Sequence, residues 1–395
     1  MVSWQQQIPR SLFQPELDDV SSLISRQRAW VEIDLQALGY NVRQLKKFIS
    51  PQTELMAVVK ADAYGHGAVT VAKTALANGA SSLAIATLAE GVELRQAGIK
   101  VPILILGAIN APEDIKAIAA WQLEPTICNA QQALVFSQTM NELGVVLPVH
   151  LKLDTGMSRL GTNWQEGAKF ANLVHNLPNL TIESIYSHFA TADESDRTTM
   201  NLQHQRFRDA IEQIQGCGIN PPRLHLANSA ATLCDRSCHY DLVRVGLALY
   251  GLYPAPHLTA TIPLKPVLQV KAKIAQVKTI SPDTGVSYGH RFISDRPTQI
   301  AVVGIGYADG VPRNLSNNLQ AIVRGQLVPQ IGAITMDQLM LNVNGIPDLQ
   351  PGEIVTLIGT EGDIAITADN WANTLDTISW EILCGFKHRL PRVIV

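Results

Sequence analysis

Cysteine is scarce in this sequence, and its spacing excludes the common zinc motifs. The chain has five cysteines among 395 residues and no CxxC pair. Cys234 and Cys238 stand close to His239, but no second pair of ligands follows at zinc spacing, so we expect no metal site. The odd number of thiols is typical of reduced, partly buried cysteines and favours the cytoplasm.

Long apolar runs and a strong net charge are also missing. No apolar stretch approaches the roughly 18 residues that a membrane helix needs, and the polar start of the chain lacks the apolar core of a signal peptide. The formal net charge is −3, whereas a protein that binds phosphate backbones is usually basic. We therefore expect a soluble protein with neither a nucleic acid nor a membrane as partner.

Apolar residues are abundant and follow two different patterns, of which the first covers residues 55–250. Short apolar runs alternate there with segments of helical periodicity, and eight runs are strand candidates: LMAVVK, SLAIAT, PILILG, EPTIC, VHLKLD, LTIESIYSHF, LHLANS and DLVRVGLALYG. Strand–helix repetition implies parallel strands, because each return needs a crossover. Eight units in about 200 residues predict a (β/α)₈ barrel. A doubly wound open sheet is the alternative, but no GxGxxG follows the first strand.

The second pattern begins near residue 262, where strand-like segments alternate with turn pairs. No long amphipathic helix interrupts them before residues 371–383, so a mostly antiparallel β domain is predicted. The Pro-rich segment 253–263 marks the boundary. The predicted order is an N-terminal extension over 1–28, a (β/α)₈ TIM-type barrel over 29–258 and a C-terminal β domain over 259–395. The first strand is left open between the barrel and the β domain.

Lys60 is the first residue whose position suggests chemistry. It ends the run LMAVVK, whose other members predict a buried strand, and functional groups in barrels project from the carboxyl ends of strands. Partial desolvation there favours the neutral amine, which suits Schiff-base chemistry. From position alone, a structural lysine that reaches solvent from a strand end is the better interpretation.

The segment that follows Lys60 reverses this preference. VVKADAYGHG (58–67) resembles the pyridoxal 5′-phosphate (PLP) binding segment of alanine racemases, in which the lysine forms the internal aldimine. Further segments resemble the same family in the same order: HLKLDTGMSRLG, YSHFATADE, HLANSAAT, RVGLALYG, SYGH, GYADG and TMDQ. The resemblance covers nearly the whole chain beyond residue 28. It implies a PLP-binding barrel, a β domain and racemisation of alanine.

Arg244 lies in an apolar strand candidate, where a charge needs a partner. A structural salt bridge would provide one. The resemblance implies instead that Arg244 faces the pyridine nitrogen of PLP, with His188 hydrogen-bonded to it. Because arginine stays protonated and only donates, that nitrogen would carry no proton and the ring would be a weaker electron sink. Such a site suits simple proton removal and return.

The resemblance also implies a group of residues that bind the phosphate of PLP. These are Tyr64, Ser229 and the backbone at Gly246 and Leu247. Barrels often bind phosphate near their seventh and eighth strands, where the last three fall. Backbone N–H groups of a loop or helix start are suitable donors to a dianion.

Racemisation requires a proton to leave one face of the substrate and to return on the other, so two bases are expected. The resemblance assigns these roles to Lys60, for the α-proton of D-alanine, and to Tyr288, for that of L-alanine. An ordinary tyrosine is a weak base at pH 7 and needs help from a neighbour. The resemblance further implies that Tyr288 comes from the partner subunit of a head-to-tail homodimer.

Four more residues receive roles from the resemblance. Arg159 would bond the substrate carboxylate and the phenolic oxygen of PLP. Lys152 would carry a carbamate derived from CO₂, because an unmodified lysine would repel the arginine that it supports. Met336 would touch the substrate carboxylate through its backbone, and Tyr307 would line the entrance, both from the β domain.

Two positions depart from the family pattern. Trp380 stands where many relatives have a tyrosine that contacts the phosphate or shapes the site, and an indole N–H donates but does not accept. Thr335 stands where relatives often have cysteine. The phosphate contact and the entrance are therefore in question, but the chemistry is not.

Three other functions are weighed against alanine racemisation. A racemase of the same fold for serine or a basic amino acid would share these motifs. A fold-related PLP decarboxylase would use a cysteine of its second domain as proton donor, and no cysteine lies between 239 and 383 here. A non-enzymatic PLP-binding protein would be a single barrel without residues 263–395. An alanine racemase that supplies D-alanine for peptidoglycan is the leading hypothesis.

Overall fold

The structure, a computed structural model, describes residues 28–395 and consists of two compact units. One unit is Asp34–Val267, and the other combines Leu268–Val395 with the described residues before Asp34. The extension predicted over 1–28 lies outside the described residues except for Arg28. The domain limits given above stay predictions beside this division.

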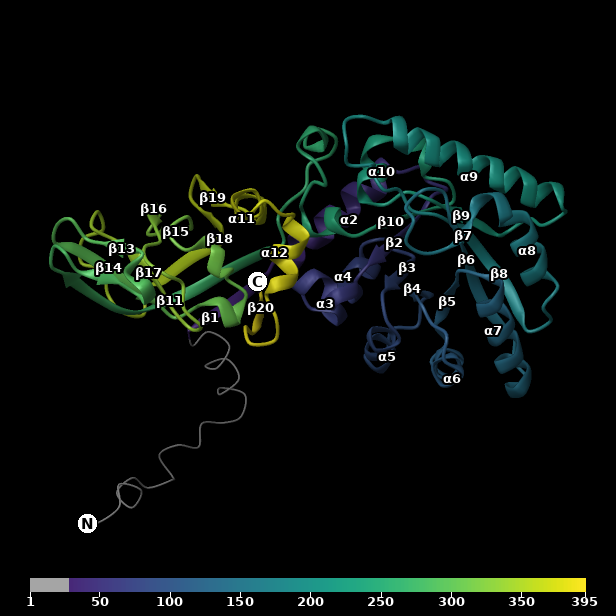
Figure 1. The fold of residues 1–395 in the computed structure, drawn as a ribbon, viewed down its shortest axis with the longest axis horizontal. Coiled ribbons are helices and arrows are strands. Elements are labelled where there is room, and N and C mark those ends of the chain that lie inside the picture. Colours follow the sequence, from purple (N-terminus) through teal and green to yellow (C-terminus); the bar gives the residue numbers. More distant parts are fainter. Residues whose placement is uncertain (1–27) are drawn as a thin grey trace, which may run out of the picture. The chain divides into compact units, whose positions relative to one another are not determined.

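The first unit is a barrel of eight parallel strands in the order β10-β2-β3-β4-β5-β6-β8-β9 (Figure 1). Their bounds are β2 Glu54–Val58, β3 Ser82–Ile85, β4 Ile103–Ala108, β5 Glu124–Ile127, β6 Leu147–Asp154, β8 Leu180–Tyr186, β9 Arg223–His225 and β10 Leu242–Val245. The short β7 (Thr162–Asn163) pairs with β6. Each of the eight strands falls within a strand candidate of the sequence or overlaps it, and the predicted fold class is confirmed.

Backbone hydrogen bonds close the seam of the barrel between β9 and β10. The N–H of Asp241 donates to the carbonyl of Leu224 at 3.1 Å, and that of Arg244 donates to the carbonyl of Ala227 at 3.0 Å. The main chain of Arg244 is therefore part of the closure, and this limits where its side chain can lie.

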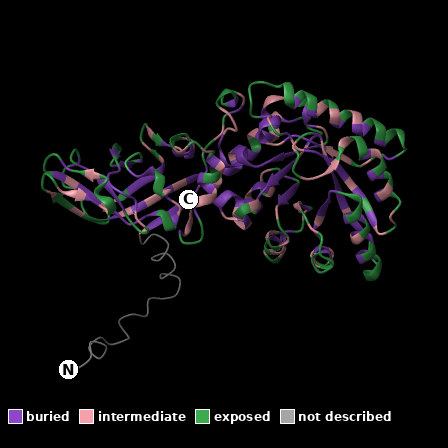
Figure 2. Cartoon of the chain, in the orientation of Figure 1, coloured by how far each residue is buried: buried purple, intermediate pink, exposed green. Residues whose placement is uncertain are grey.

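Helices return the chain between the strands and cover the outside of the barrel (Figure 1). They are α2 Leu35–Phe48, α4 Ala68–Ala77, α5 Leu88–Gln96, α6 Pro112–Ala120, α7 Ala130–Leu143, α8 Gly167–His175, α9 Thr198–Gly216 and α10 Ser229–Cys234. Caps fix several starts: Thr87 forms a capping box with Glu90, and Asn129 accepts from the backbone of Gln132. Figure 2 shows the strands buried and the outer helix faces exposed.

The second unit is a mostly antiparallel sheet built around the long strand β11. Its main path is β16-β15-β18-β11-β1-β20, and β14, β17 and β19 attach to it. The bounds are β1 Ala29–Ile33, β11 Leu268–Ile280, β14 Thr298–Val303, β15 Gln320–Val323, β16 Gln326–Pro329, β17 Leu339–Asn342, β18 Ile354–Glu361, β19 Ile364–Ile366 and β20 Arg392–Ile394. A separate hairpin joins β12 Gly285–Val286 and β13 Phe292–Ile293. Strand β1 pairs antiparallel with β11 and parallel with β20.

The helix predicted over residues 371–383 is two helices in the structure. Helix α11 (Ala368–Leu375) ends at Asp376, which has a left-handed φ of 54°, and α12 (Ser379–Gly385) follows. Two short helices therefore stand where one continuous amphipathic helix was predicted. Within residues 28–395, no helix is long and apolar enough to cross a membrane.

Candidate active site

Lys60 begins a backbone turn of unusual handedness. Strand β2 ends at Val58, so the lysine lies two residues beyond the strand and not at its last position as predicted. The four residues that follow, 61–64, have φ values between 52° and 56°. Each non-glycine residue in this left-handed region costs about 1–2 kcal/mol. Such strain is concentrated at functional sites.

Buried aromatic groups hold this left-handed turn in place. The His66 ring donates from Nδ1 to the carbonyls of Ala63 and Tyr64, at 2.9 and 3.0 Å, because carbonyls can only accept. The same ring stacks on Tyr250, with 4.4 Å between centroids. The Tyr250 hydroxyl in turn donates to the carbonyl of Val58 at 2.9 Å. The turn is thus tied back to the strand from which it starts.

The residues that the sequence assigns to phosphate binding come together beside this turn. The Ser229 hydroxyl, at the start of α10, accepts from the backbone N–H of Gly246 at 3.0 Å and of Ala248 at 3.5 Å. A Cβ at Gly246 would lie 2.6 Å from the hydroxyl oxygen of Tyr64, so a larger residue there would displace the tyrosine. Leu247 is buried next to it. Hydroxyl and amide groups of this kind are donors that suit a phosphate.

Arg244, in β10, is buried among neutral acceptors. Its guanidinium donates to His225 Nδ1 at 2.7 Å, the Ser187 carbonyl at 2.7 Å, the Leu226 carbonyl at 3.1 Å and His188 Nδ1 at 3.2 Å. Burial lowers the pKa of Arg244 to about 10, so the group is still protonated at neutral pH. The predicted pair of Arg244 and His188 is therefore in hydrogen-bond contact.

His188 lies where several cations of the barrel converge. Burial is the main cause that holds its pKa well below the usual value, and nearby positive charge is the second. The four contributing cations are Arg244, Lys152, Arg159 and Lys60. These four residues lie near or just beyond the carboxyl ends of the parallel strands β2, β6 and β10, which is one end of the barrel.

Lys152, in β6, is buried in this positive environment. Burial, together with the charges of Arg244 and Arg159, lowers the pKa of its amine to about 8. Its Nζ lies 5.4 Å from the ring centroid of Tyr186. A large fraction of Lys152 is thus neutral in mildly basic solution, and the neutral amine is the form that reacts with CO₂.

Arg159 lies at the surface beside a cavity. It follows β6, and its side chain is exposed. The cavity has a volume of about 530 Å³, and Cys128, Thr162 and Phe170 also line it. A cation that is accessible from solvent is suited to meet the carboxylate of an incoming small molecule.

The other three predicted site residues lie in the β unit and are exposed. The exposed fractions are 73% for Tyr288, 53% for Met336 and 42% for Tyr307. Tyr288 is in the 3₁₀ turn η7 (Tyr288–His290), whose residues line a cavity of about 340 Å³. The backbone N–H of Tyr307 donates to the carbonyl of Thr335 at 3.0 Å. Tyr307 and Met336 are therefore on neighbouring segments.

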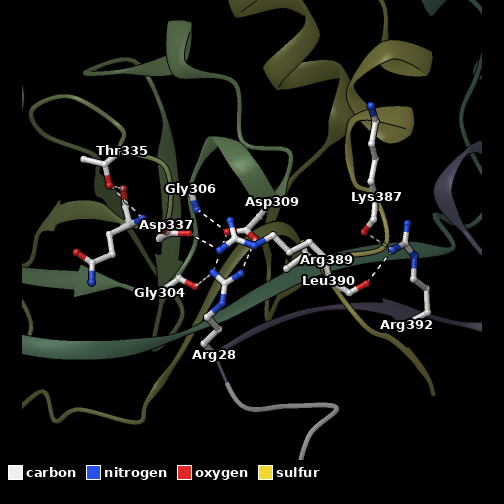
Figure 3. Close-up of polar contacts among 11 residues, drawn as sticks. Arg28, Gly304, Gly306, Asp309, Thr335, Asp337, Lys387, Arg389, Leu390 and Arg392 are labelled. Atoms are coloured by element: carbon white, nitrogen blue, oxygen red, sulfur yellow. Dashed lines mark hydrogen bonds and ion pairs between the residues drawn. The ribbon is translucent and has the colours of Figure 1, made fainter.

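A buried carboxylate supports these two segments (Figure 3). Asp309 receives two hydrogen bonds from Arg28, at 2.5 and 2.8 Å, and one from the backbone of Gly306 at 2.9 Å. Arg389 lies 3.5 Å from the same carboxylate and also bonds Asp337. Arg28 and Arg389, from two distant parts of the sequence, thus hold the Tyr307 turn through Asp309.

Two central residues of the site were missed by the sequence analysis. Tyr186 is fully buried, its ring stacks on His225 with 4.6 Å between centroids, and the Arg244 guanidinium carbon lies 5.0 Å from the ring centroid. Tyr186 is the last residue of β8 and His225 is the last residue of β9, where functional groups of barrels project. Their place in two strand candidates, at the carboxyl ends of the barrel strands, could have indicated a role in the site.

The fold and the site define a class of protein: a (β/α)₈ barrel enzyme with a C-terminal β domain, whose barrel gathers cations and phosphate-type donors at one end. The family model described as "Alanine racemase, N-terminal domain" matches residues 33–254. The model described as "Alanine racemase, C-terminal domain" matches residues 267–394. The chain therefore belongs to the alanine racemase family of amino-acid racemases.

Individual relatives agree with the family models. The chain is 66% identical to an alanine racemase of Nostoc sp. over 93% of this chain and 96% of that protein. It is 64% identical to an alanine racemase of Synechocystis sp. over 94% of this chain and 100% of that protein. The crystal structure of the Bacillus anthracis alanine racemase superposes with a TM-score of 0.88 at 36% identity, covering 93% of this chain and 95% of that one.

Proposed function

We propose that this protein interconverts L-alanine and D-alanine with PLP bound in its barrel. The observation that carries the proposal is the buried Arg244, whose guanidinium is hydrogen-bonded to His225 and His188 at the end of the barrel where Lys60 follows β2. The donors at Ser229 and Gly246 provide the complementary phosphate site. The family membership supports alanine as the substrate.

The residues present fit PLP. The space that a Cβ at Gly246 would fill lies against the Tyr64 hydroxyl, and hydroxyl and backbone donors surround it. Lys60 supplies an amine on the turn that carries Tyr64. When bound, PLP acidifies the α-proton of an amino acid by drawing electrons away from that carbon.

Arg244 would hold the pyridine nitrogen as a donor. Its four other contacts are with acceptors, and its pKa of about 10 keeps it charged at neutral pH. Arginine only donates hydrogen bonds, so the pyridine nitrogen that it contacts would have to be the acceptor and would carry no proton. His188 is held neutral by burial and by Arg244, so it accepts from the arginine and fixes its orientation.

Lys60 and Tyr288 would be the two bases, one for each face of the substrate. Lys60 would remove the α-proton of D-alanine and return one to form it, and Tyr288 would do the same for L-alanine. A single base on one side cannot serve both faces. The exposure of Tyr288 in its own chain supports a role in the site of a partner subunit.

Arg159, Met336 and Tyr307 would bind the substrate. Arg159 would pair with the carboxylate, the backbone at Met336 would contact the same group, and Tyr307 would narrow the entrance. Lys152 would support Arg159 as a carbamate, which converts a repelling cation into an anion. The lowered pKa of Lys152 supports this reaction, because only the neutral amine combines with CO₂.

The active unit would be a homodimer in the cytoplasm that provides D-alanine for peptidoglycan. The three exposed site residues of the β unit, Tyr288, Tyr307 and Met336, support sharing of sites between subunits. Neither a membrane nor a nucleic acid would be a partner.

The decisive experiment follows L-alanine formation from D-alanine by the purified protein, and compares the rate with those for serine and lysine. Borohydride reduction of the loaded enzyme and peptide mapping locate the reactive lysine. We expect alanine to be the fastest substrate and Lys60 to carry the label. Labelling of another lysine, or faster turnover of serine or lysine, would contradict the proposal.

A further inference from the structure

A line of polar side chains crosses the interior of the barrel and ends on Arg244. It begins at Glu124, the first residue of β5, whose Oε2 lies 2.8 Å from His150 Nε2. His150 Nδ1 lies 2.6 Å from the Ser184 hydroxyl, which is 2.8 Å from His225 Nε2. His225 Nδ1 then meets Arg244 at 2.7 Å. Four neighbouring strands and β10 thus contribute one residue each.

The chemistry of these groups gives every bond in the line one direction. Arginine only donates, so His225 must accept at Nδ1 and carry its proton on Nε2. That proton is donated to the Ser184 hydroxyl. Ser184 then has its own proton to donate to His150 Nδ1, which leaves the His150 proton on Nε2, facing the Glu124 carboxylate.

The two charged ends require the same direction. A carboxylate accepts and a guanidinium donates, so both ends favour the same tautomer of each histidine. The interior members are almost entirely buried: His150 is 3% exposed, Ser184 0% and His225 1%. Water is therefore not available to replace a lost partner, and a broken bond leaves a buried polar group unsatisfied.

We infer that Glu124, His150 and Ser184 are positioning residues that act through His225 to fix the orientation of Arg244. Arg244 donates to the lone pair of His225 Nδ1, and the other bonds of the line fix the direction of that lone pair. The ring of Tyr186 stacks on His225 and holds the plane of the imidazole. The tautomer arrangement is independent of the activity. Its consequence for racemisation rests on the function proposed above.

Nitrogen-15 NMR of the full-length protein with labelled histidine tests the arrangement directly. We expect His225 and His150 each to be a single tautomer at neutral pH, with a protonated Nε2 and an unprotonated Nδ1. The resonances are assigned by their loss in His225→Gln and His150→Gln. A protonated Nδ1 on either ring would overturn the inference.

Substitution of Ser184 tests the consequence for catalysis. Ser184→Ala should lower kcat by about tenfold, the size expected when a buried donor loses its acceptor, with little change in KM for alanine. The absorption band of bound PLP should shift, because Arg244 is no longer fixed. Ser184→Thr keeps the hydroxyl and should restore kcat.

Ser82→Ala is the matched control. Ser82 is a buried strand serine of the same barrel, and its hydroxyl has no hydrogen-bond partner among the described residues. We expect wild-type kcat and an unchanged PLP spectrum from this variant. An equal loss in Ser82→Ala and Ser184→Ala would mean that the effect is general, and would overturn the inference.

Glu124 allows a test far from the site, even if the Ser184 variants fail to fold. Its side chain is partly exposed, so substitution disturbs the core little. Glu124→Gln keeps an acceptor for His150 and should retain most of kcat, whereas Glu124→Met should lower kcat and shift the His150 Nε2–H resonance. If Glu124→Met kept the wild-type kcat and the wild-type His150 Nε2–H resonance, the positioning role of Glu124 would be contradicted. Expected tautomers in a protein that does not racemise alanine would instead refute the proposed function alone.

Discussion

At the scale of single residues, burial decides which side chains of the site carry charge. Arg244 is buried but keeps its proton at neutral pH, with a pKa of about 10. His188 and His225 are held neutral, first by burial and then by the charge of Arg244. The result is one fixed cation surrounded by acceptors, which is suited to hold a ring nitrogen and unsuited to protonate it.

Removal of the Tyr288 hydroxyl should separate the two bases. Tyr288→Phe should lower the rate of racemisation by about 10²–10⁴-fold, the usual contribution of a general acid or base. Exchange of the α-proton of D-alanine with D₂O should persist, because Lys60 alone can perform it. The measurement compares both rates by NMR. Tyr40→Phe, for which no role is proposed, serves as control, and an unchanged rate of racemisation in Tyr288→Phe would exclude Tyr288 as a base.

The amine of Lys152 should make stability depend on pH when CO₂ is absent. Its pKa falls from 10.5 unfolded to about 8 folded. The unfolded state therefore binds more protons between these values, and the free energy of unfolding should rise with pH across this window, by up to roughly 3 kcal/mol.

Urea unfolding of wild type and Lys152→Met in CO₂-free buffer measures this difference. The stability of wild type relative to the variant should increase from pH 8 to pH 10.5. A difference that stays constant over that range would show that Lys152 is not buried as an amine. Mass spectrometry without acid then detects the carbamate when CO₂ is restored.

At the scale of elements, the site depends on how β2 and β10 end. Strand β2 passes into the left-handed turn that carries Lys60 and Tyr64, and β10 ends at Val245, directly before Gly246. The two strands are neighbours in register, with Arg244 opposite Met56. A parallel pair therefore delivers the lysine, the arginine and the phosphate donors to the same edge of the barrel.

Addition of a methyl group at Gly246 should damage the phosphate site. The Cβ of Gly246→Ala would lie 2.6 Å from the Tyr64 hydroxyl oxygen, so the tyrosine must move. We expect PLP affinity to fall by about tenfold or more, as for loss of one charge-assisted hydrogen bond, in an absorbance titration. Gly216→Ala is the matched control, since nothing lies within 4 Å of that Cβ. Equal affinity in both variants would refute the phosphate assignment.

Relief of strain in the left-handed turn should stabilise the fold. Ala61 is exposed and has a φ of 53°, so Ala61→Gly loses no packing and should raise the free energy of unfolding by up to about 1 kcal/mol. Ala130→Gly, at the exposed first position of helix α7, has no such strain to relieve and should not raise it. Urea unfolding measures both. A destabilised Ala61→Gly variant would mean that the turn is not strained.

At the scale of the whole molecule, the proposed site residues are divided between two units of one chain. Lys60 and Arg244 belong to the barrel, and Tyr288 and Met336 to the β unit. In a homodimer with shared sites, each active site would combine the barrel residues of one subunit with the β-unit residues of the other. Large exposed side chains such as Tyr288 would then be covered in the active assembly.

Mixing two inactive variants tests this sharing. In a hybrid dimer of Lys60→Ala and Tyr288→Phe, one site receives both wild-type residues and the other receives neither. An equimolar mixture that exchanges subunits should recover about a quarter of wild-type activity, because half of the dimers are hybrids with one good site each. A mixture of Lys60→Ala with itself is the control. No recovery in a mixture shown to exchange subunits would exclude shared sites.

Much of the fold could be predicted because its strands and helices follow from apolar periodicity and turn residues that are local in the sequence. The eight apolar runs gave the barrel strands, and the turn-rich region after residue 262 gave the β sheet. The prediction of a single helix over 371–383 was wrong. The apolar periodicity continues across Asp376, but the left-handed backbone of that residue ends the first helix there. The left-handed turn after Lys60 was also not predicted, because alanine has no preference for that conformation.

The sequence by itself determined the strand and helix order, the family resemblance and the residue types available for chemistry, because these follow from periodicity and from motifs of adjacent residues. Only the tertiary structure decided that Glu124, His150, Ser184 and His225 form one line to Arg244. These residues come from separate strands up to 120 positions apart. Their contact arises from barrel closure and burial, which no local pattern in the sequence records.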